Sequence, residues 1–341
     1  MEHWRLAVSE IRYDRLHDSH VLIAPERLHR PDRRKVKREV YSKVTCPFCE
    51  GNESMTPKEI FAMRALDGTA NATGWKTRVV PNLYKAVAIE APHAHHSGVF
   101  EYWDGFGAHE VIIDTPTHRT SMMDWSHEET VMWLKTLRER LGDLRRDHRI
   151  SFISLFKNEG YDAGSTMEHC HTQLIALPVI PKAVREMNRH AREYFHTHHH
   201  ALMESIVRAE EESGIRLIEQ LGEFSAFCPY ASGYPFEVMI GSKKCIEQID
   251  TIVDAHVDEL ASLLVSVLQR LRSQLKDFSF NLWISTLPLG EDVLEYEAHR
   301  LTIRITPRIY RFGGFEVNTQ MMINPVSPEM AAKLLRGNDH D

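Results

Sequence analysis

The sequence predicts an α+β protein that contains two copies of one strand–helix–strand–strand unit. In the first copy, Gly107–Asp114 has the pattern of a strand. Ser126–Glu129 is a capping box that opens a helix with apolar residues at helical spacing. Two further strand patterns, Ile150–Phe156 and His171–Leu177, follow this helix, and a glycine-containing turn at 158–164 separates them. The order of these elements defines the repeating unit.

The second half of the chain repeats this order. Strand, helix, strand and strand patterns follow one another at 236–240, 254–275, 278–285 and 299–307. Three landmark residues recur at an offset of about 128 residues, in the pairs Glu110 and Glu237, Phe152 and Phe280, and His169 and His299. In this alignment Leu301 takes the place of His171, so at most one copy carries a His-x-His pair. The alternative is a chance similarity between common patterns.

Length and composition limit the class of protein. The 341 residues suffice for one large or two ordinary domains, which we expect at 1–185 and 186–341. The 41 basic and 48 acidic residues give a net charge of −7, which argues against a general binder of nucleic acid or of a membrane surface. No apolar run approaches the roughly 18 residues of a spanning helix, and the N-terminus has no signal-peptide core. We therefore expect a cytoplasmic protein whose five cysteines are reduced.

The segment His169-Cys-His-Thr-Gln173 is the strongest candidate for a reaction centre. Because strand residues alternate between faces, we expect His169, His171 and Gln173 on one face, with Cys170 turned into the packing. A neutral imidazole can attack phosphorus, and the glutamine amide can donate to a phosphoryl oxygen. The upstream turn, with Ser165 and Thr166, can present N–H and hydroxyl groups to phosphate. The alternatives are ordinary strand histidines, or two metal ligands.

A second candidate site is the Cys46-Pro-Phe-Cys49 segment. This spacing is typical of a metal-binding knuckle, and no thioredoxin-like strand–motif–helix pattern surrounds it. The remaining ligands must come from elsewhere in the chain, and the candidates are His118, His109 and His169. A zinc ion held partly by His169 would fix the chain beside the nucleophile. The alternative is a free thiol pair.

With these residues in view, the chain resembles the galactose-1-phosphate uridylyltransferase family of the histidine-triad superfamily. The similar segments keep their order and spacing over nearly the whole chain. They are 12–14, 23–31, 46–53, 78–84, 107–111, 156–160, 169–173, 306–308, 314–316 and 323–325.

The resemblance implies two histidine-triad-like halves, each an antiparallel sheet with helices packed on it, and a homodimer. It implies a ping-pong reaction in which a UDP-hexose gives its uridylyl group to His171, assisted by Gln173, and a hexose-1-phosphate then accepts that group. It also implies one Zn²⁺ ion, held by Cys46, Cys49, His118 and His169. The implied contacts to nucleotide and phosphate are Arg27, Arg30, Asn82, Asn158 and Thr166, with Ser165 adjacent. The second half is implied to contribute to the sugar site through Glu316.

The chain also departs from the family's pattern. Cys170 stands where relatives usually have proline, and Asn318-Thr-Gln320 replaces a common Gly-Thr-Gly, which leaves the acceptor sugar open. A second metal site is expected to be incomplete, with remnants at His200, Cys245 and His299. Two other functions remain possible from the residues. One is an ADP-sugar phosphorylase or adenylyltransferase, and the other is a non-catalytic nucleotide-binding or zinc-binding protein.

Overall fold

The computed structural model describes residues 9–29, 45–243, 246–290 and 293–337. Its strands are β1 (Glu10–Asp14), β2 (Ser19–Ile23), β3 (Phe61–Arg64), β4 (Trp75–Pro81), β5 (His95–His96), β6 (Tyr102–Trp103), β7 (Ala108–Ile113), β8 (Phe152–Glu159), β9 (His171–Leu177), β10 (Leu217–Leu221), β11 (Phe224–Phe227), β12 (Val238–Ser242), β13 (Phe280–Ile284), β14 (Thr302–Pro307) and β15 (Met322–Asn324). Its α-helices are α1 (His127–Leu144), α2 (Lys182–His198), α3 (Leu202–Ser213), α4 (Asp254–Leu275), α5 (Val293–Ala298), α6 (Gly314–Thr319) and α7 (Pro328–Arg336). Four 3₁₀ turns are η1 (Pro25–His29), η2 (Glu53–Met55), η3 (Met122–Asp124) and η4 (Tyr161–Ala163).

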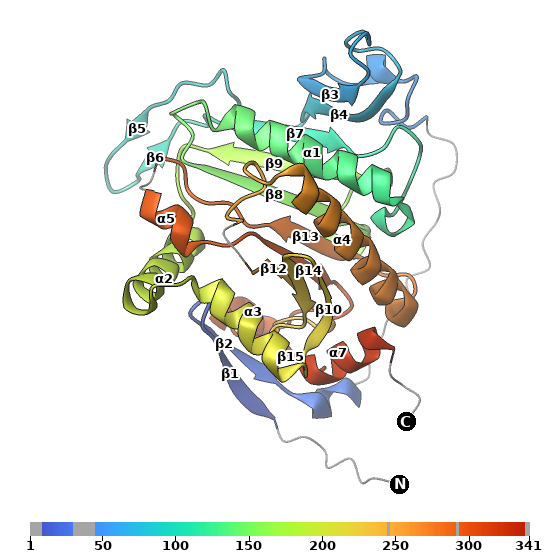
Figure 1. Cartoon of the computed structure of the whole chain (residues 1–341). Helices are drawn as coiled ribbons and strands as arrows, with labels where there is room; N and C mark the ends of the chain where they lie inside the picture. The colour runs from blue at the N-terminus through green and yellow to red at the C-terminus, as the bar shows by residue number, and fades with distance from the viewer. Residues whose placement is uncertain (1–8, 30–44, 244–245, 291–292, 338–341) are drawn as a thin grey trace.

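One ten-stranded antiparallel sheet forms the centre of the protein. Its strand order is β10-β11-β12-β14-β13-β8-β9-β7-β4-β3, so two five-stranded units meet where β13 pairs with β8 (Figure 1). Each unit contains the same succession of strands and one long helix, α1 or α4. The predicted α+β class and the duplication are therefore confirmed, and the two units share a single sheet. The expected boundary at residue 185 falls inside α2.

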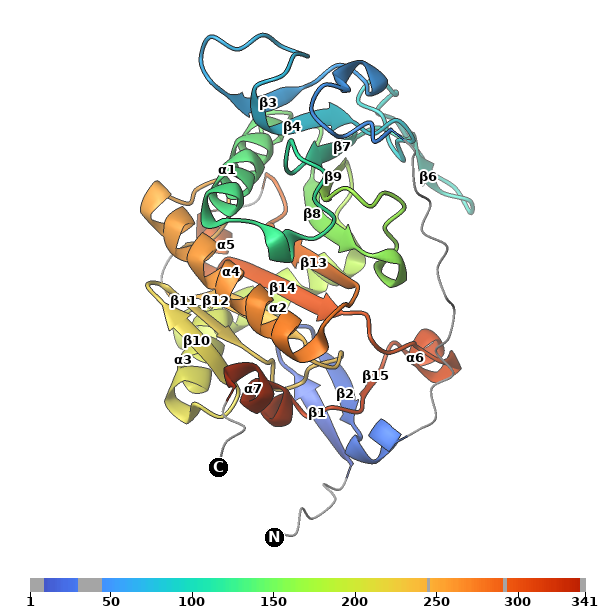
Figure 2. The same cartoon turned by 90° about the vertical axis from the view of Figure 1, so that its right-hand side faces the viewer.

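The helices α1 and α4 cover the same face of the sheet and pack against each other (Figure 2). Their apolar residues, including Leu137 and Leu264, form the main hydrophobic core with the strands beneath them. The predicted capping box is present, because Ser126 accepts from the Glu129 N–H and the Glu129 carboxylate accepts from the Ser126 N–H. Such a cap contributes about 1 kcal/mol to helix stability. It starts α1 at the residue where the pattern predicted it.

The alternation of faces corrects the landmark alignment between the two units. In β9 and the turn before it, Cys170 and Leu174 pack into the core beneath α1, so His171 faces away from that helix. In the second unit, however, Leu301, directly before β14, and Ile303 in this strand pack into the core beneath α4. Pairing His171 with Leu301 therefore joins residues of opposite faces, since a slip of one residue exchanges the faces of a strand. The outward row of β14 instead contains Thr302, Arg304 and Thr306.

The other two landmark pairs are out of phase for the same reason. Phe280 belongs to the main core whereas Phe152 does not. Glu110 faces α1 and pairs with Arg140, whereas Glu237 pairs with Arg304 on the opposite face. The conclusion that the alignment supported still holds, since histidine is absent from the outward row of β14 in the described part of the chain.

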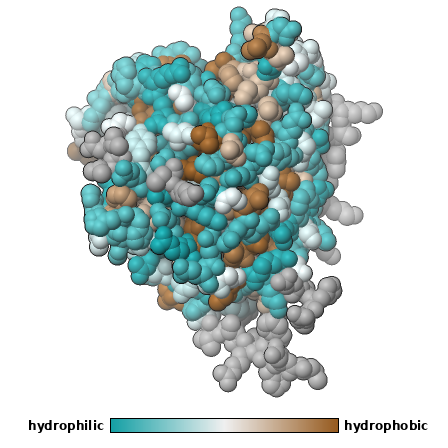
Figure 3. Space-filling view, viewed as in Figure 1, coloured by the Kyte–Doolittle hydropathy of each residue, from teal (hydrophilic) through white to brown (hydrophobic). Residues whose placement is uncertain are grey.

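The N-terminal hairpin packs against the second unit. The strands β1 and β2 form a three-stranded sheet with β15, and β2 runs parallel to β15. The Arg12 guanidinium donates to Glu329 of α7 and to the Tyr230 carbonyl, so it joins the hairpin to the C-terminal helix. The surface in the orientation of Figure 1 is mostly hydrophilic, with separate apolar patches (Figure 3). Within the described residues, we find no helix with the length and apolar character needed to cross a membrane.

Candidate functional site

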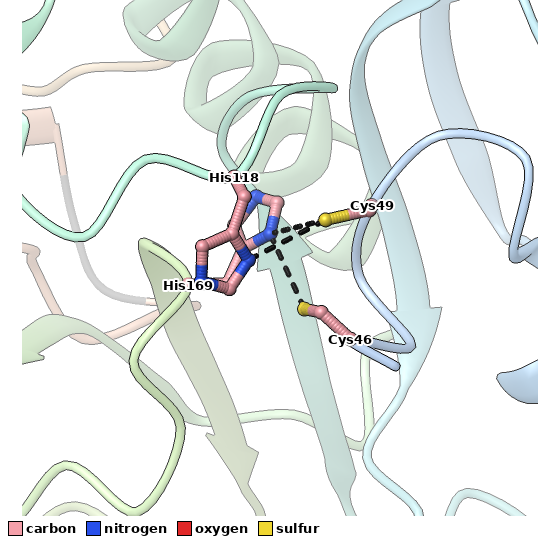
Figure 4. Close-up of side chains that lie close together, drawn as sticks. All are labelled: Cys46, Cys49, His118 and His169. Atoms are coloured by element: carbon pink, nitrogen blue, oxygen red, sulfur yellow. Dashed lines mark hydrogen bonds between the residues drawn. The ribbon is translucent and has the colours of Figure 1, made fainter. Parts of the chain in front are cut away.

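Four predicted metal ligands meet beside the start of β9. Cys46 and Cys49 lie in the loop before η2, His118 lies in the loop after β7, and His169 lies two residues before β9 (Figure 4). Their ligand atoms all lie within 4.8 Å of one another. The Sγ of Cys46 is 3.5 Å from Nδ1 of His169, and the Sγ of Cys49 is 3.4 Å from Nδ1 of His118. The predicted set of four is therefore brought together, and it can hold a metal ion.

The donor set suits zinc. Tetrahedral Zn²⁺ with bonds of about 2.0–2.3 Å places neighbouring donor atoms roughly 3.3–3.8 Å apart, which is the range of these contacts. The Nε2–H of His169 donates to the Thr115 carbonyl at 2.9 Å, so Nδ1 keeps its lone pair on the side of the thiols. Burial lowers the pKa of His169 to about 4, and the ring is therefore neutral at neutral pH. The other early candidate ligand, His109, lies elsewhere in the site and is not part of this cluster.

The His171 ring is held in one tautomer. Its Nδ1–H donates to the His169 carbonyl at 2.9 Å, which leaves the lone pair on Nε2. The side chain is buried, and burial holds the pKa of His171 below its ordinary value. A neutral imidazole with a free Nε2 is the form that can attack phosphorus. The same main-chain segment thus leaves Nδ1 free on one histidine and Nε2 free on the next.

Phe48 links the two histidines to the cysteine loop. This ring lies inside the Cys46-Pro-Phe-Cys49 segment, and its centroid is 5.6 Å from the His171 ring and 6.1 Å from the His169 ring. Both rings therefore face the same aromatic side chain, as the expected shared face requires. A disturbance of the cysteine loop would reach the candidate nucleophile directly through Phe48.

A buried ion pair lies behind the nucleophile. The Lys157 ammonium donates to Asp114 at 2.8 Å and to the His171 carbonyl at 3.3 Å, and both side chains are almost fully buried. Burial alone would lower the pKa of Lys157, but the neighbouring Asp114 carboxylate outweighs it and holds the pKa above its ordinary value. Lys157 therefore remains charged and fixes the first residue of β9.

Cys170, the residue between the two histidines, faces the core as expected. Its side chain is 3% exposed, and its thiol lies 3.9 Å from a Glu159 carboxylate oxygen. Its N–H donates to the Arg119 carbonyl at 2.7 Å, a hydrogen bond that proline cannot make. With cysteine at this position the backbone lacks the stiffness of a proline ring, but it gains a hydrogen bond to the loop that carries His118. Burial raises the pKa of the Cys170 thiol, which makes it a neutral packing group.

Gln173 lies on the same face as His171, in contact with His109 of the neighbouring strand. Its Oε1 is 3.0 Å from Nε2 of His109, and Nδ2 of Asn82 is 3.0 Å from the same ring nitrogen. Asn82, a predicted nucleotide contact, is therefore brought to the site. Asn82 directly follows β4, and its backbone N–H donates to the His109 carbonyl.

The end of β8 and the turn after it bring three more predicted contacts to the junction of the two units. Asn158 accepts from Asn281 of β13 at 2.8 Å, and Asn281 also donates to the Ala163 carbonyl of the turn. The Ser165 hydroxyl donates to the Met167 carbonyl at 2.7 Å, while Thr166 is exposed. Gly160 has a φ of +79°, and a Cβ there would lie 2.3 Å from the Ser279 hydroxyl, so only glycine suits this turn.

Two predicted contacts lie far from this cluster in the same chain. Arg27 lies in η1, directly after β2, and Glu316 lies in α6. Figure 2 shows β2 and α6 well separated from β9. The Glu316 carboxylate accepts from the Gly313 N–H at 2.8 Å, so it also caps its own helix. Arg30 lies outside the described residues.

A second metal cluster is absent from the parts of the chain that the structure describes. Cys245 is outside those parts. His299 is buried, and its Nε2 has no hydrogen-bond partner among the described residues.

Some side chains at the site were not predicted. Asn281 belongs to the predicted strand pattern 278–285, and Lys157 directly follows the predicted strand Ile150–Phe156, but nothing in these patterns distinguishes a site residue from a core residue. Phe48 reads as an ordinary apolar residue between two cysteines. His109 was noticed only as a candidate metal ligand. The signal that could have found it is its place on a strand that pairs with the His-x-His strand.

The duplicated sheet, with a His-x-His pair at the start of β9, is the arrangement that the resemblance to the histidine-triad superfamily implied. The chain belongs to the galactose-1-phosphate uridyl transferase family, and residues 2–181 match the model of that family's N-terminal domain. It is 31% identical to the ADP-glucose phosphorylase of Arabidopsis thaliana, over 96% of this chain and 92% of that protein. It is 22% identical to the galactose-1-phosphate uridylyltransferase of Thermotoga maritima, over 96% and 98% of the two chains.

Solved structures give the same grouping. A crystal structure of the Arabidopsis thaliana ADP-glucose phosphorylase with bound ADP-glucose superposes with a TM-score of 0.83 at 29% identity, covering 98% of this chain and 100% of that chain. A uridylyltransferase structure with 22% identity superposes with a TM-score of 0.74, over 96% and 97% of the two chains, and shows the shared fold.

Proposed function

We propose that this protein transfers a nucleotidyl group from a nucleotide sugar to an acceptor through a covalent intermediate on His171. The observation that carries the proposal is the tautomer of this buried histidine. Its Nδ1–H is committed to the His169 carbonyl, so Nε2 is the free nucleophilic atom. Gln173 is the assisting amide, on the same face of β9. The presence of both residues argues against a non-catalytic nucleotide-binding or zinc-binding protein on this scaffold.

The reaction balances in two displacements. Nε2 of His171 attacks the α-phosphorus, a P–N bond forms, and the P–O bond to the sugar-bearing phosphate breaks to release a sugar 1-phosphate. In the second step, a phosphate oxygen of the acceptor attacks the same phosphorus and the P–N bond breaks. A hexose-1-phosphate acceptor gives a new nucleotide sugar, whereas inorganic phosphate gives a nucleoside diphosphate. The chemistry at His171 is the same for both acceptors.

We favour an adenine nucleotide sugar with inorganic phosphate as acceptor, and keep the UDP-hexose uridylyltransferase as the second candidate. The support is the order of similarity. The ADP-glucose phosphorylase is 31% identical to this chain, whereas the galactose-1-phosphate uridylyltransferase of Thermotoga maritima is 22% identical. The sequence alone favoured the uridylyl donor, because its motifs are those of the uridylyltransferase family.

A labelling experiment separates these candidates. Purified protein is mixed with ADP-glucose or UDP-glucose carrying a labelled α-phosphate, and protein-bound label is measured. The expected result is an acid-labile, base-stable adduct, formed faster from ADP-glucose and absent in His171→Ala. Faster labelling from UDP-glucose would reverse the ranking of donors. Absence of label from either donor would contradict the covalent mechanism.

We further propose that the metal at the cysteine–histidine cluster is one Zn²⁺ ion with a structural role. Two thiols and two imidazole nitrogens are ligands that zinc prefers, and four protein ligands leave no open position. When bound, the ion would neutralise the thiolates and stiffen the loop that carries Phe48. Mass spectrometry of the native protein should then find one zinc ion per chain. Two zinc ions per chain would show that a second metal site exists.

We also propose a homodimer in which a second copy supplies Arg27 and Glu316 to the site. The support is the separation of these residues from His171 within one chain, together with the exposed Phe315 and Val317 of α6. Mixing the inactive His171→Ala and Glu316→Gln variants should restore part of the activity through hybrid dimers. A monomer in solution, or no recovery after mixing under exchange conditions, would contradict this arrangement.

A further inference from the structure

His109 makes three polar contacts at one side of the site. Its Nδ1 is 3.0 Å from the N–H of Ala86, its Nε2 is 3.0 Å from Oε1 of Gln173, and the same Nε2 is 3.0 Å from Nδ2 of Asn82. The ring stands on β7, whose register with β9 sets His109 opposite Ile175 and Val111 opposite Gln173. The imidazole therefore reaches diagonally across the strand pair to the Gln173 amide.

The backbone contact determines where the proton of this ring lies. A peptide N–H is always a donor, so Nδ1 of His109 must accept from Ala86. A neutral ring then carries its proton on Nε2. That proton is donated to Oε1 of Gln173, and two of the three contacts are hydrogen bonds. With the opposite tautomer only the contact with Asn82 would be a hydrogen bond, and Nδ1–H would face the Ala86 N–H. The first arrangement is therefore the stable one.

This arrangement also determines the orientation of the Gln173 amide. Because the carbonyl end faces Nε2–H of His109, the NH₂ end is turned away from that ring, on the face that Gln173 shares with His171. The Asn82 amide is oriented by a different contact. Its Oδ1 accepts from the Tyr84 N–H at 2.8 Å, and its NH₂ finds no lone pair on the protonated Nε2. Both amides thus retain N–H groups for oxygen atoms of a bound ligand.

We propose that His109 is a positioning residue for the nucleotidyl transfer, and that it holds the Gln173 amide with its NH₂ group directed to the phosphoryl oxygens. This inference depends on the proposed function of His171. Without His109 the amide of Gln173 could rotate by half a turn and present its carbonyl oxygen to a negatively charged phosphoryl group. A preorganised donor would then become a repulsive acceptor.

A double-mutant cycle tests the proposal. The rate of nucleotidyl-histidine formation is measured by rapid quench with labelled ADP-glucose and, separately, UDP-glucose, for the wild type, His109→Leu, Gln173→Ala and the double variant. We expect His109→Leu to slow the reaction about tenfold or more, and Gln173→Ala by a similar or larger factor. The double variant should be no slower than Gln173→Ala, since His109 acts through that amide.

His109→Gln provides the matched control. A glutamine at this position can accept from the Ala86 N–H with its oxygen and donate to Gln173 with its nitrogen, so most of the wild-type rate should return. Zinc content and the melting temperature identify any variant that has lost its fold.

The possible outcomes are distinct. Multiplicative effects in the double variant, or a His109→Gln variant as slow as His109→Leu, would overturn the positioning role while His171 chemistry stands. Wild-type protein that forms no adduct with either donor would overturn the proposed function and this inference together.

Discussion

The two units of the sheet have the same strand order, and each has one long helix on the same face of the sheet. They differ on the opposite face. In the first unit, the face away from α1 carries His109, His171 and Gln173, and it is bordered by Phe48 of the cysteine loop. In the second unit, the same face is closed. Met203 and Val207 of α3 pack there against Met239, with Leu16 of the N-terminal hairpin beside them.

The closure of the second unit depends on small details of sequence. A Cβ at Gly241 of β12 would lie 2.9 Å from a Val207 methyl carbon, so glycine permits the close approach of α3. Arg304, in the outward row of β14, forms an ion pair with Glu237 and contacts the His17 ring. One scaffold therefore supplies a site in one copy and a packed structural face in the other. The comparison shows that function depends on which side chains a unit carries on its outward face and on whether other elements pack over that face.

The largest expected effect separates the two outward rows. His171→Ala should lower the rate of nucleotidyl transfer on the order of 10⁴-fold or more, because it removes the nucleophile. Thr302→Ala, in the outward row of β14, should retain nearly full activity. Turnover of ADP-glucose and UDP-glucose measures both. Comparable losses in the two variants would mean that the second unit takes part in the chemistry.

Removal of the metal should affect only the first unit's face. In Cys49→Ser the zinc content should fall, and transfer should slow by about 10–100-fold because Phe48 no longer supports the His171 ring. Cys228→Ser replaces a fully buried thiol of the second unit and should leave the zinc content unchanged. Metal analysis and activity are measured on the same samples. Full activity in zinc-free Cys49→Ser would show that the cysteine loop does not support the nucleophile.

One buried ion pair from each unit provides a third test. Lys157→Met leaves the Asp114 carboxylate buried without its partner and should cost about 3–5 kcal/mol of unfolding free energy. It should also slow transfer, because Lys157 holds the His171 carbonyl. Arg304→Met breaks the pair with Glu237 in the second unit, and should lower stability without slowing transfer in the folded fraction. Denaturant unfolding and single-turnover rates distinguish the two. Equal slowing in both would remove the special role of Lys157.

His299 predicts a pH dependence of stability from the second unit. Burial and the Arg300 guanidinium lower the pKa of His299 to about 4, against 6.5 for an exposed histidine. Between these values the unfolded chain binds the extra proton, so stability is full above pH 6.5 and falls as the pH drops towards 4. The loss is on the order of 3 kcal/mol. His299→Leu should flatten this part of the unfolding profile without changing transfer rates at pH 7. A profile as steep as that of the wild type would contradict the assignment.

The smallest expected effect concerns the two equivalent helices. Ser126→Ala removes the cap of α1 and should cost about 1 kcal/mol, whereas the N-cap residue of α4 is Val253, which provides no side-chain cap. Val253→Ser should therefore add about 0.5–1 kcal/mol. Thermal melting measures both shifts. Destabilisation by Val253→Ser would indicate that the valine, although 55% exposed, contributes packing that outweighs a cap.

The sequence by itself determined the local elements and the chemical nature of the site. The alternation in 169–177 predicted the strand, its faces and the inward turn of Cys170, because a period of two is a local property of the chain. The helix at 254–275 and the capping box of α1 follow equally from local spacing and hydrogen bonding. The four metal ligands came from the cysteine spacing together with the family resemblance, and the structure brings them together.

The tertiary structure alone decided which residues of different segments meet. Only the pairing of β7 with β9 brings His109 to Gln173, and only the folded core buries Lys157 beneath His171. The predicted alignment of the two units was wrong by one residue. Sequence similarity allows either alignment, and only the packing against α1 and α4 determines which residues face the helices. Contacts between residues far apart in the chain produce no periodic pattern in the sequence. They are determined by packing and by hydrogen-bond geometry in the folded protein.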